Sequence, residues 1–236
     1  MKRAGWWVSA IGLLGAALAA PATARAQVLE QQLAPLPNPE PWQAALGIRN
    51  TFLRSAGYDP FSSSDVLTQV SLSGERTVTR RDALAFAAGA AFDYGGSDAT
   101  ARSAPSSIRL MRLSLVAEGR YYAWPRAYGF VRAATGMLRT TAEVDDPSTL
   151  NGQPLVDRFA GLSLDASAGA AVRLTNPGSP VAAWITAEAG YGWAASHHLL
   201  LATQVPARDQ AKLAPLDLGT IDPRGVFMRL AAAIAF

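Results

Sequence analysis

The only two histidines of the chain, His197 and His198, are adjacent and follow Ser196. A serine, a histidine and an acid can transfer an acyl group when the histidine reaches the hydroxyl and the acid orients the ring. Glu188 is the nearest preceding acid, but it lies in the preceding segment, and neighbouring strand residues point to opposite faces. Two adjacent histidines also fall short of the three or four converging ligands of a usual metal site. We therefore interpret them as residues of a polar rim and predict no catalytic residue, no metal and no cofactor.

Six arginines and five acids form a second group, because they fall on the same alternate positions of the segments described below. Opposite charges in a narrow interior stabilise one another, whereas a buried ion without a counter-ion is costly. Arginine suits multidentate pairing in a confined space. We predict a salt-bridged interior rather than a selective pore. The group comprises Arg49, Glu75, Asp93, Arg112, Glu118, Arg120, Arg132, Asp165, Arg173, Glu188 and Arg229.

Apolar residues recur at every second position from Trp42 onward, which is typical of β-strands rather than helices. The last segment shows this best, because one face is wholly apolar and the other is small or charged. The apolar face consists of Val226, Met228, Leu230, Ala232, Ile234 and Phe236. The pattern predicts strands near 42–54, 65–76, 83–94, 107–122, 127–142, 158–174, 181–195 and 225–236.

Two residues interrupt this alternation. Arg139 has the opposite parity to Arg132, so one of them must point outward, and we expect Arg139 to lie near a rim where its guanidinium can reach water. Trp184 falls on the same face as Glu188, which we interpret as a β-bulge.

The connections between these strands alternate in length. Short turns are expected at 77–82, 124–126 and 175–180. Long polar connections are expected at 55–64, 95–106, 143–157 and 196–224. All short turns then fall at one end and all long loops at the other, as in barrels with periplasmic turns and extracellular loops. The loop 196–224 is long enough to bind an extracellular ligand.

Aromatic residues concentrate at both ends of the predicted strands, which indicates girdles at two membrane interfaces. A soluble sandwich or a lipocalin-like barrel, the alternative, would have aromatic rings pointing inward at mid-strand. The short-turn set is Trp42, Tyr121, Trp124, Tyr128, Trp184 and Phe236. The long-loop set is Phe52, Phe92, Tyr94, Phe159, Tyr191, Trp193 and Phe227.

Residues 1–26 have the features of an export signal. Lys2 and Arg3 precede an apolar stretch, and Pro21 is followed by an Ala-Arg-Ala cleavage motif, so we expect the mature chain to begin at Gln27. An uncleaved membrane anchor is the alternative, because the apolar stretch is nearly long enough to span a bilayer.

The charge of the chain excludes a nucleic-acid partner. Of the 21 basic residues, Lys2, Arg3 and Arg25 belong to the signal, which leaves 18 basic against 18 acidic residues and no basic patch. The absence of cysteine excludes disulfides and thiolate metal sites.

Residues 42–236 resemble the small outer-membrane barrels of the OmpA/OmpX type, an all-β, eight-stranded, antiparallel up-and-down transmembrane fold. The resemblance rests on the strand count, the loop asymmetry, the girdles and the last strand. It implies that Phe236, with Ile234 and Leu230 at alternate positions before it, is the signal read by the outer-membrane assembly machinery. Residues 27–41, which contain four prolines, are expected to form a short extended periplasmic leader.

The first functional hypothesis is a non-enzymatic outer-membrane barrel with a plugged polar lumen, in contact with outer-membrane lipid and lipopolysaccharide, that has a structural or surface-interaction role. The first alternative is a lipid A-modifying hydrolase or acyltransferase, which would require Ser196 or His198 for activity. The second alternative is a narrow channel for small solutes, which paired lumen charges disfavour. The fold itself does not select among these functions.

Overall fold

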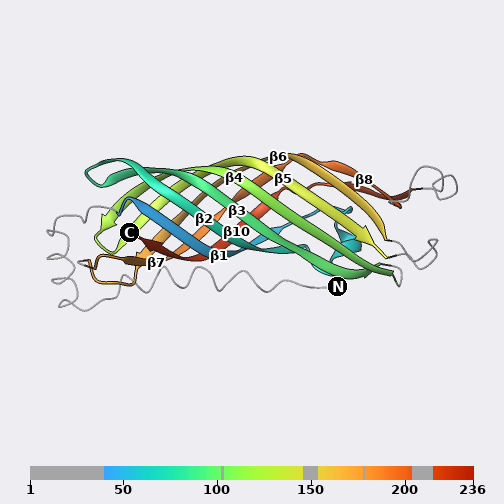
Figure 1. Cartoon of the computed structure of the whole chain (residues 1–236), viewed down its shortest axis with the longest axis horizontal. Coiled ribbons are helices and arrows are strands. Elements are labelled where there is room, and N and C mark those ends of the chain that lie inside the picture. The colour runs from blue at the N-terminus through green and yellow to red at the C-terminus, as the bar shows by residue number, and fades with distance from the viewer. Residues whose placement is uncertain (1–39, 102–103, 146–153, 178, 204–214) are drawn as a thin grey trace, which may run out of the picture.

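The computed structural model describes residues 40–101, 104–145, 154–177, 179–203 and 215–236 (Figure 1). The predicted signal and nearly all of the predicted leader lie outside these residues. Eight strands form a barrel, and a hairpin of two further strands extends from one end. The barrel strands are β1 (Trp42–Phe52), β2 (Val66–Arg81), β3 (Leu84–Ala101), β4 (Ala104–Trp124), β5 (Ala127–Val144), β6 (Leu155–Arg173), β7 (Ala182–Ala194) and β10 (Gly225–Ala235).

Each barrel strand pairs antiparallel with the next, and β10 returns to pair with β1 from Gln43↔Ala235 to Thr51↔Phe227. Backbone hydrogen bonds in both directions between Trp42 and Phe236, at 3.1 Å and 2.9 Å, complete this seam. Closure satisfies the backbone groups that an open edge would expose to lipid. The prediction of an all-β, eight-stranded antiparallel barrel is confirmed.

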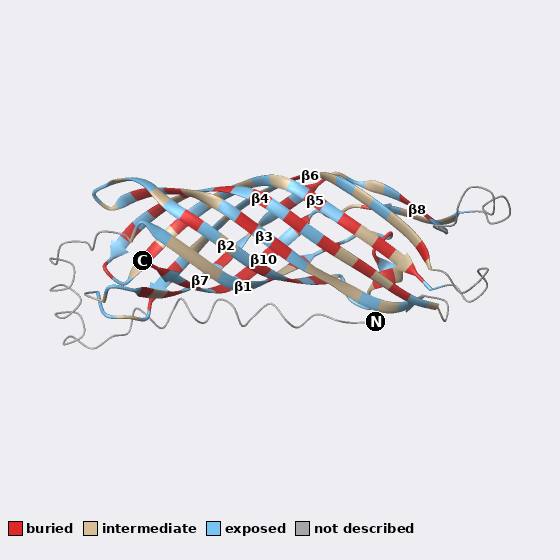
Figure 2. Cartoon of the chain, viewed as in Figure 1, coloured by how far each residue is buried: buried red, intermediate tan, exposed pale blue. Residues whose placement is uncertain are grey.

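The outer surface of the barrel is apolar. Buried and exposed residues alternate without exception along β10, and Figure 2 shows the same alternation along other strands. Leu115 on β4 and Leu162 on β6 expose 69% and 67% of their surface, although both lie in mid-strand. Large exposed aliphatic side chains on almost every barrel strand form a continuous apolar patch far too large for a protein surrounded by water. This surface faces lipid.

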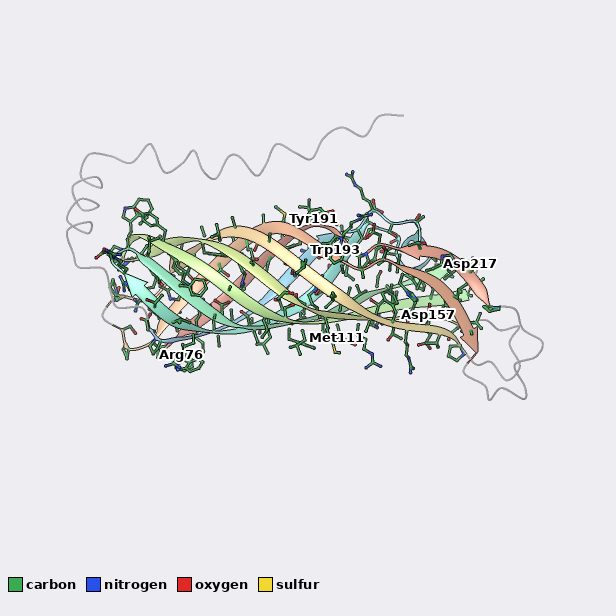
Figure 3. All side chains as sticks on the ribbon, turned by 90° about the horizontal axis from the view of Figure 1, so that it is seen from above. Arg76, Met111, Asp157, Tyr191, Trp193 and Asp217 are labelled. Atoms are coloured by element: carbon green, nitrogen blue, oxygen red, sulfur yellow. The ribbon has the colours of Figure 1, made fainter. Side chains whose placement is uncertain are left out.

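The apolar band has the height of a bilayer core. On β4 it extends from Met111 to Tyr121, and Figure 3 shows Met111 on the outer surface. These ten residue steps, at roughly 3.3 Å each and a strand tilt of roughly 40°, span about 25 Å along the barrel axis.

The ends of the band carry exposed aromatic side chains, but four residues of the predicted girdles point inward. Tyr128, Trp184 and Phe227 are buried in the lumen, and Phe159 packs against the interior. Each has the parity of the inward charges on its own strand, and the rings fill lumen volume above and below those charges. The other nine residues of the predicted girdles are exposed, as is Phe86: Trp42, Phe52, Phe92, Tyr94, Tyr121, Trp124, Tyr191, Trp193 and Phe236.

The bulge predicted at Trp184 is also wrong, because its pairing with Ala233 and Arg173 is in regular register. Irregular register occurs instead at Thr77/Thr79 and at Tyr122/Trp124, next to short turns. Arg139 is exposed on the outer face, as predicted.

One end of the barrel has only short connections among the described residues, and we call it the short-turn end. Residues 82–83 and 125–126 connect β2 to β3 and β4 to β5. Asp82 adopts the left-handed conformation, with φ 52°, that a tight turn requires. The C-terminus lies at this end, as Figure 1 shows.

At the opposite end, which we call the far end, the predicted loop 95–106 is largely strand, and strands extend into both ends of the predicted loop 143–157. β3 continues to Ala101 and β4 begins at Ala104, within the predicted loop 95–106, and β5 and β6 likewise extend into 143–157. The predicted loop 196–224 contains the hairpin of β8 (His197–Thr203) and β9 (Leu216–Ile221), and 55–64 contains the 3-10 helix η2 (Asp59–Phe61). The far-end extensions of β3 to β6 alternate polar and apolar residues, and this pattern suits a strand in water as well as a strand in lipid. Within the described ranges, the structure contains no helix long and apolar enough to cross a bilayer.

Candidate functional site

Among the charged side chains of the lumen, those nearest the far end gather around Asp165 of β6, which lies between two arginines. Arg112 Nη1 approaches both carboxylate oxygens of Asp165, at 2.6 Å and 2.5 Å, and Arg49 binds the same carboxylate at 2.6 Å and 3.2 Å. Arg49 also reaches Asp93 at 3.3 Å and lies over the ring of Phe227, 3.8 Å from its centroid. Asp165 is the only carboxylate paired with Arg112 among the described residues.

The middle of the lumen continues the same chain of charges. Arg229 lies between Asp93, at 3.5 Å, and Glu188, at 3.0 Å. Glu188 also receives a hydrogen bond from the Ser167 hydroxyl at 2.5 Å and pairs with Arg132 at 3.3 Å. Glu188 therefore has three partners in the lumen: Arg229, Arg132 and Ser167.

The part nearest the short-turn end is a four-membered group. Arg120 pairs with Glu75 at 2.7 Å and with Glu118 at 2.6 Å. Arg132 pairs with the same two carboxylates, at 3.4 Å from Glu118 and in close contact with Glu75. The structure thus connects ten of the eleven predicted residues into one network of five arginines and five carboxylates.

The network is electrically balanced and shielded from water. Its side chains are at most 8% exposed. Two small cavities of ≈ 20 Å³ and ≈ 10 Å³ lie beside it, the first next to Glu118 and the second next to Asp93, and Arg132 borders both. Each is about the size of one water molecule. The Nε atoms of Arg132 and Arg229, which line the cavities, make no hydrogen bond to a described protein atom, although Arg132 Nε lies 3.4 Å from Glu118, so a water in such a cavity would satisfy part of the network.

Arg173, the eleventh predicted residue, lies apart from the network. It pairs with Glu40 at 3.2 Å, close to the short-turn end, and its guanidinium lies over the ring of Trp184. Packed rings fill this part of the lumen, with Tyr128 centred 5.0 Å from both Tyr122 and Trp184. An aromatic layer therefore separates the ion network from the short-turn end.

An apolar layer covers the network at the far end, and our sequence analysis missed it. Tyr58 and Phe61, from the segment around η2, are buried against Ile108 of β4 and Leu199 of β8. The available signal was the inward parity of β4, which changes from charged at Arg112 to apolar toward its start. The layer consists of Leu53, Tyr58, Phe61, Leu67, Ile108, Leu110, Leu138, Ala142, Val144, Leu155, Ala194, Leu199, Leu201 and Ile221.

The histidines belong to the far-end hairpin. His197 Nε2 lies 3.1 Å from Asp157, and its ring stacks on Phe159 at 4.1 Å between centroids. His198 approaches Asp217 at 3.2 Å (Figure 3 labels both aspartates, at the far end). The backbone N–H of Gly219 and the hydrogen bond from His198 lower the pKa of Asp217.

These contacts do not assemble the Ser/His/acid set of the enzymatic alternative, because Glu188 is held by lumen arginines. Ser196 is exposed. The described residues contain no group of three or more acids and histidines that could hold a metal ion.

The closed eight-stranded ring, its lipid-facing band and its polar lumen define a small transmembrane β-barrel, which is the fold that the resemblance predicted.

Comparison with known proteins gives similarities of fold. No protein-family model and no curated protein matches the chain. Among solved structures, Neisserial surface protein A matches with a TM-score of 0.48 and 11% identity, over 83% of this chain and 97% of that one. Ail of Yersinia pestis matches at 0.47 and 12%, over 84% and 100%. The N-terminal barrel of Pseudomonas aeruginosa OprF matches at 0.36 and 11%, over 84% and 100%.

Proposed function

We propose that this chain is a non-enzymatic integral protein of the bacterial outer membrane, with a sealed lumen and a surface-exposed far end that has a structural or surface-interaction role. The short-turn end would face the periplasm. The short connections at that end support this orientation, the lipid-facing band supports the membrane location, and an export signal at 1–26 would supply the route.

The layered lumen is the observation that carries this proposal. A solute moving along the axis would meet the aromatic layer, then the balanced ion network, then the apolar layer of the far end. Passage of an ion would require the separation of buried pairs at high energetic cost. The arrangement therefore favours a plug over the narrow channel considered above.

The enzymatic alternative has less support. A triad needs an acid that orients the histidine, and Glu188 is held by Arg132 and Arg229 instead. Asp157 does orient His197, but it also accepts the backbone N–H of Leu200 at 3.0 Å, which suits a residue that anchors the hairpin. Lipid A profiles from cells with the wild-type chain and with Ser196→Ala or His198→Ala test this alternative, and a changed acyl pattern would revive it.

The last strand supports the proposed contact with the outer-membrane assembly machinery. Phe236, Ile234 and Leu230 lie exposed on the lipid-facing side of β10, which forms the closing seam with β1. Outer-membrane lipid and lipopolysaccharide are the remaining proposed partners, together with an extracellular ligand for the segment 196–224.

Two measurements test the proposal. Fractionation of producing cells is expected to place the chain in the outer membrane, with slower electrophoretic migration after boiling. In planar bilayers the purified protein is expected to add no conductance steps, whereas a general porin inserted in the same way does. Discrete ohmic steps that scale with inserted protein would contradict a sealed lumen.

A further inference from the structure

Three outward-facing arginines lie on adjacent strands at the far end of the lipid-facing band. Arg109 of β4, Thr141 of β5 and Arg158 of β6 pair in one row, and Arg139 of β5 lies in the next row toward the membrane. Arg139 is therefore the diagonal neighbour of both other arginines, at a typical separation of roughly 7–8 Å. We call Arg109, Arg139 and Arg158 the arginine patch.

The patch contains unsatisfied positive charge. Arg109 forms a bidentate pair with Asp98, at 2.7 Å and 3.0 Å. Arg139 and Arg158 are exposed, and neither forms an ion pair or hydrogen bond with another described residue. Glu143 faces outward one row farther from the membrane than Arg158, and Asp98 lies in that same outer row. The cations are thus nearest to the lipid and the acids farthest from it.

The position of the patch relative to the bilayer is specific. Directly below it lies the row Leu113, Met137 and Leu162, whose exposed side chains belong to the lipid-facing band. On β3, Tyr94 lies in the same row as Met111 and Arg139, and the outer face of β7 carries Tyr191 and Trp193, which Figure 3 labels near Met111 along the barrel axis. The strands β4 to β6 have no exposed aromatic residue at this end among the described residues. On these three strands the outer face carries guanidinium groups there instead.

We propose that the arginine patch binds the phosphate groups of a phosphorylated glycolipid of the lipid A class, whose acyl chains lie along Leu113, Met137 and Leu162. This inference rests on the proposed outer-membrane location, because that class of lipid forms the outer leaflet. Guanidinium groups bind phosphate through paired, charge-assisted hydrogen bonds. Two arginines without a partner among the described residues, beside a third one, match a headgroup with two phosphates better than a headgroup with one.

The test uses the full mature chain folded into phosphatidylcholine nanodiscs that contain bisphosphorylated lipid A. Native mass spectrometry counts the lipid A molecules that stay bound to the protein. Wild-type protein is expected to retain at least ten times more lipid A than Arg139→Gln/Arg158→Gln. The two side chains have no described partner to lose, so the variant is expected to fold and to keep its heat-modifiable migration.

The control is Arg54→Gln/Arg224→Gln, which removes the same formal charge from the far end on the opposite side of the barrel, next to β1 and β10, where Arg224 forms an ion pair with Asp222. It is expected to retain lipid A like the wild type. Equal retention by the patch variant and the wild type, or an equal loss in the control, would overturn the inference. The same comparison is made with phosphatidylglycerol in place of lipid A. If the patch variant loses bound phosphatidylglycerol as strongly as it loses lipid A, the assignment to a glycolipid is overturned. Protein that does not enter the discs contradicts the proposed function itself, and the inference falls with it.

Discussion

Replacement of Asp165 by asparagine tests how dry the lumen is. The carboxylate of Asp165 is the only anion paired with Arg112 among the described residues, whereas Arg49 keeps a second partner in Asp93. Asp165→Asn keeps the size of the side chain and removes its charge. The substitution therefore leaves one guanidinium, only 4% exposed, without a counter-ion.

The expected effect follows from burial. Removal of one partner of a buried ion pair destabilises a protein by about 3–5 kcal/mol, because the other charge stays desolvated. The same change at an exposed pair costs about 0–1 kcal/mol. Arg109 and Asp98 provide that comparison within this chain, because they form a similar bidentate pair whose side chains are 42% and 69% exposed.

Urea unfolding of protein folded in lipid vesicles, followed by tryptophan fluorescence, gives the free energy of unfolding. We expect a loss of about 3–5 kcal/mol for Asp165→Asn and less than about 1 kcal/mol for Asp98→Asn. The double variant Arg112→Met/Asp165→Asn is expected to recover most of the loss, since it leaves no unpaired charge. Equal small losses for Asp165→Asn and Asp98→Asn would refute the reasoning, because they would mean that water screens the lumen charges.

Three other substitutions test separate parts of the structure. Leu115→Arg, at the middle of the lipid-facing band, is expected to lower the free energy of unfolding in vesicles by about 2–4 kcal/mol, and a change near zero would argue against lipid at this position. Phe61→Ala is expected to cost about 3–5 kcal/mol in the far-end apolar layer and to expose 55–64 to protease; an intact segment would contradict that packing. His198→Ala is expected to raise the pKa of Asp217, as NMR titration would show, while the N–H of Gly219 keeps it below its ordinary value. Because the pKa of Asp217 is lowered in the folded chain, its ionised carboxylate adds to the free energy of unfolding at any pH above the ordinary carboxyl pKa of roughly 4. This contribution is lost as the pH falls through the lowered pKa.

The two-residue alternation predicted the ring and the inward charges, because the pleat of a strand fixes which side chains share a face. Arg112 and Leu113 illustrate this, since one lies in the ion network and the other faces lipid. Alternation does not say how far along the axis an inward residue lies or what it meets there. The pairing of Arg112 with Asp165 depends on strand register across the lumen, which the sequence pattern leaves open.

The errors have a common physical origin. The sequence analysis predicts girdle positions for Trp184 and Tyr128, because aromatic residues near strand ends suit an interface. Their parity points them inward instead, where their rings fill the lumen between the ion network and the short-turn end. The extension of β4 to Ala104 has no such signal, because residues 95–106 are polar and small and are as typical of a loop as of a strand in water. Ile108 and Leu110 point inward there, against η2 and the hairpin, and such contacts between distant segments have no local signature.

Two adjacent positions on β4 test the central claim most directly, because Ser114 is buried in the lumen and Leu115 faces outward. The chain has no native cysteine, so Ser114→Cys and Leu115→Cys each introduce a single thiol. In vesicles, the cysteine at 115 is expected to react with a lipid-soluble maleimide and not with a charged, water-soluble thiosulfonate. The cysteine at 114 is expected to react with neither reagent until urea unfolds the barrel. Reaction of the folded protein with the water-soluble reagent would contradict the account: at 115 it would mean water outside the barrel, and at 114 an aqueous lumen.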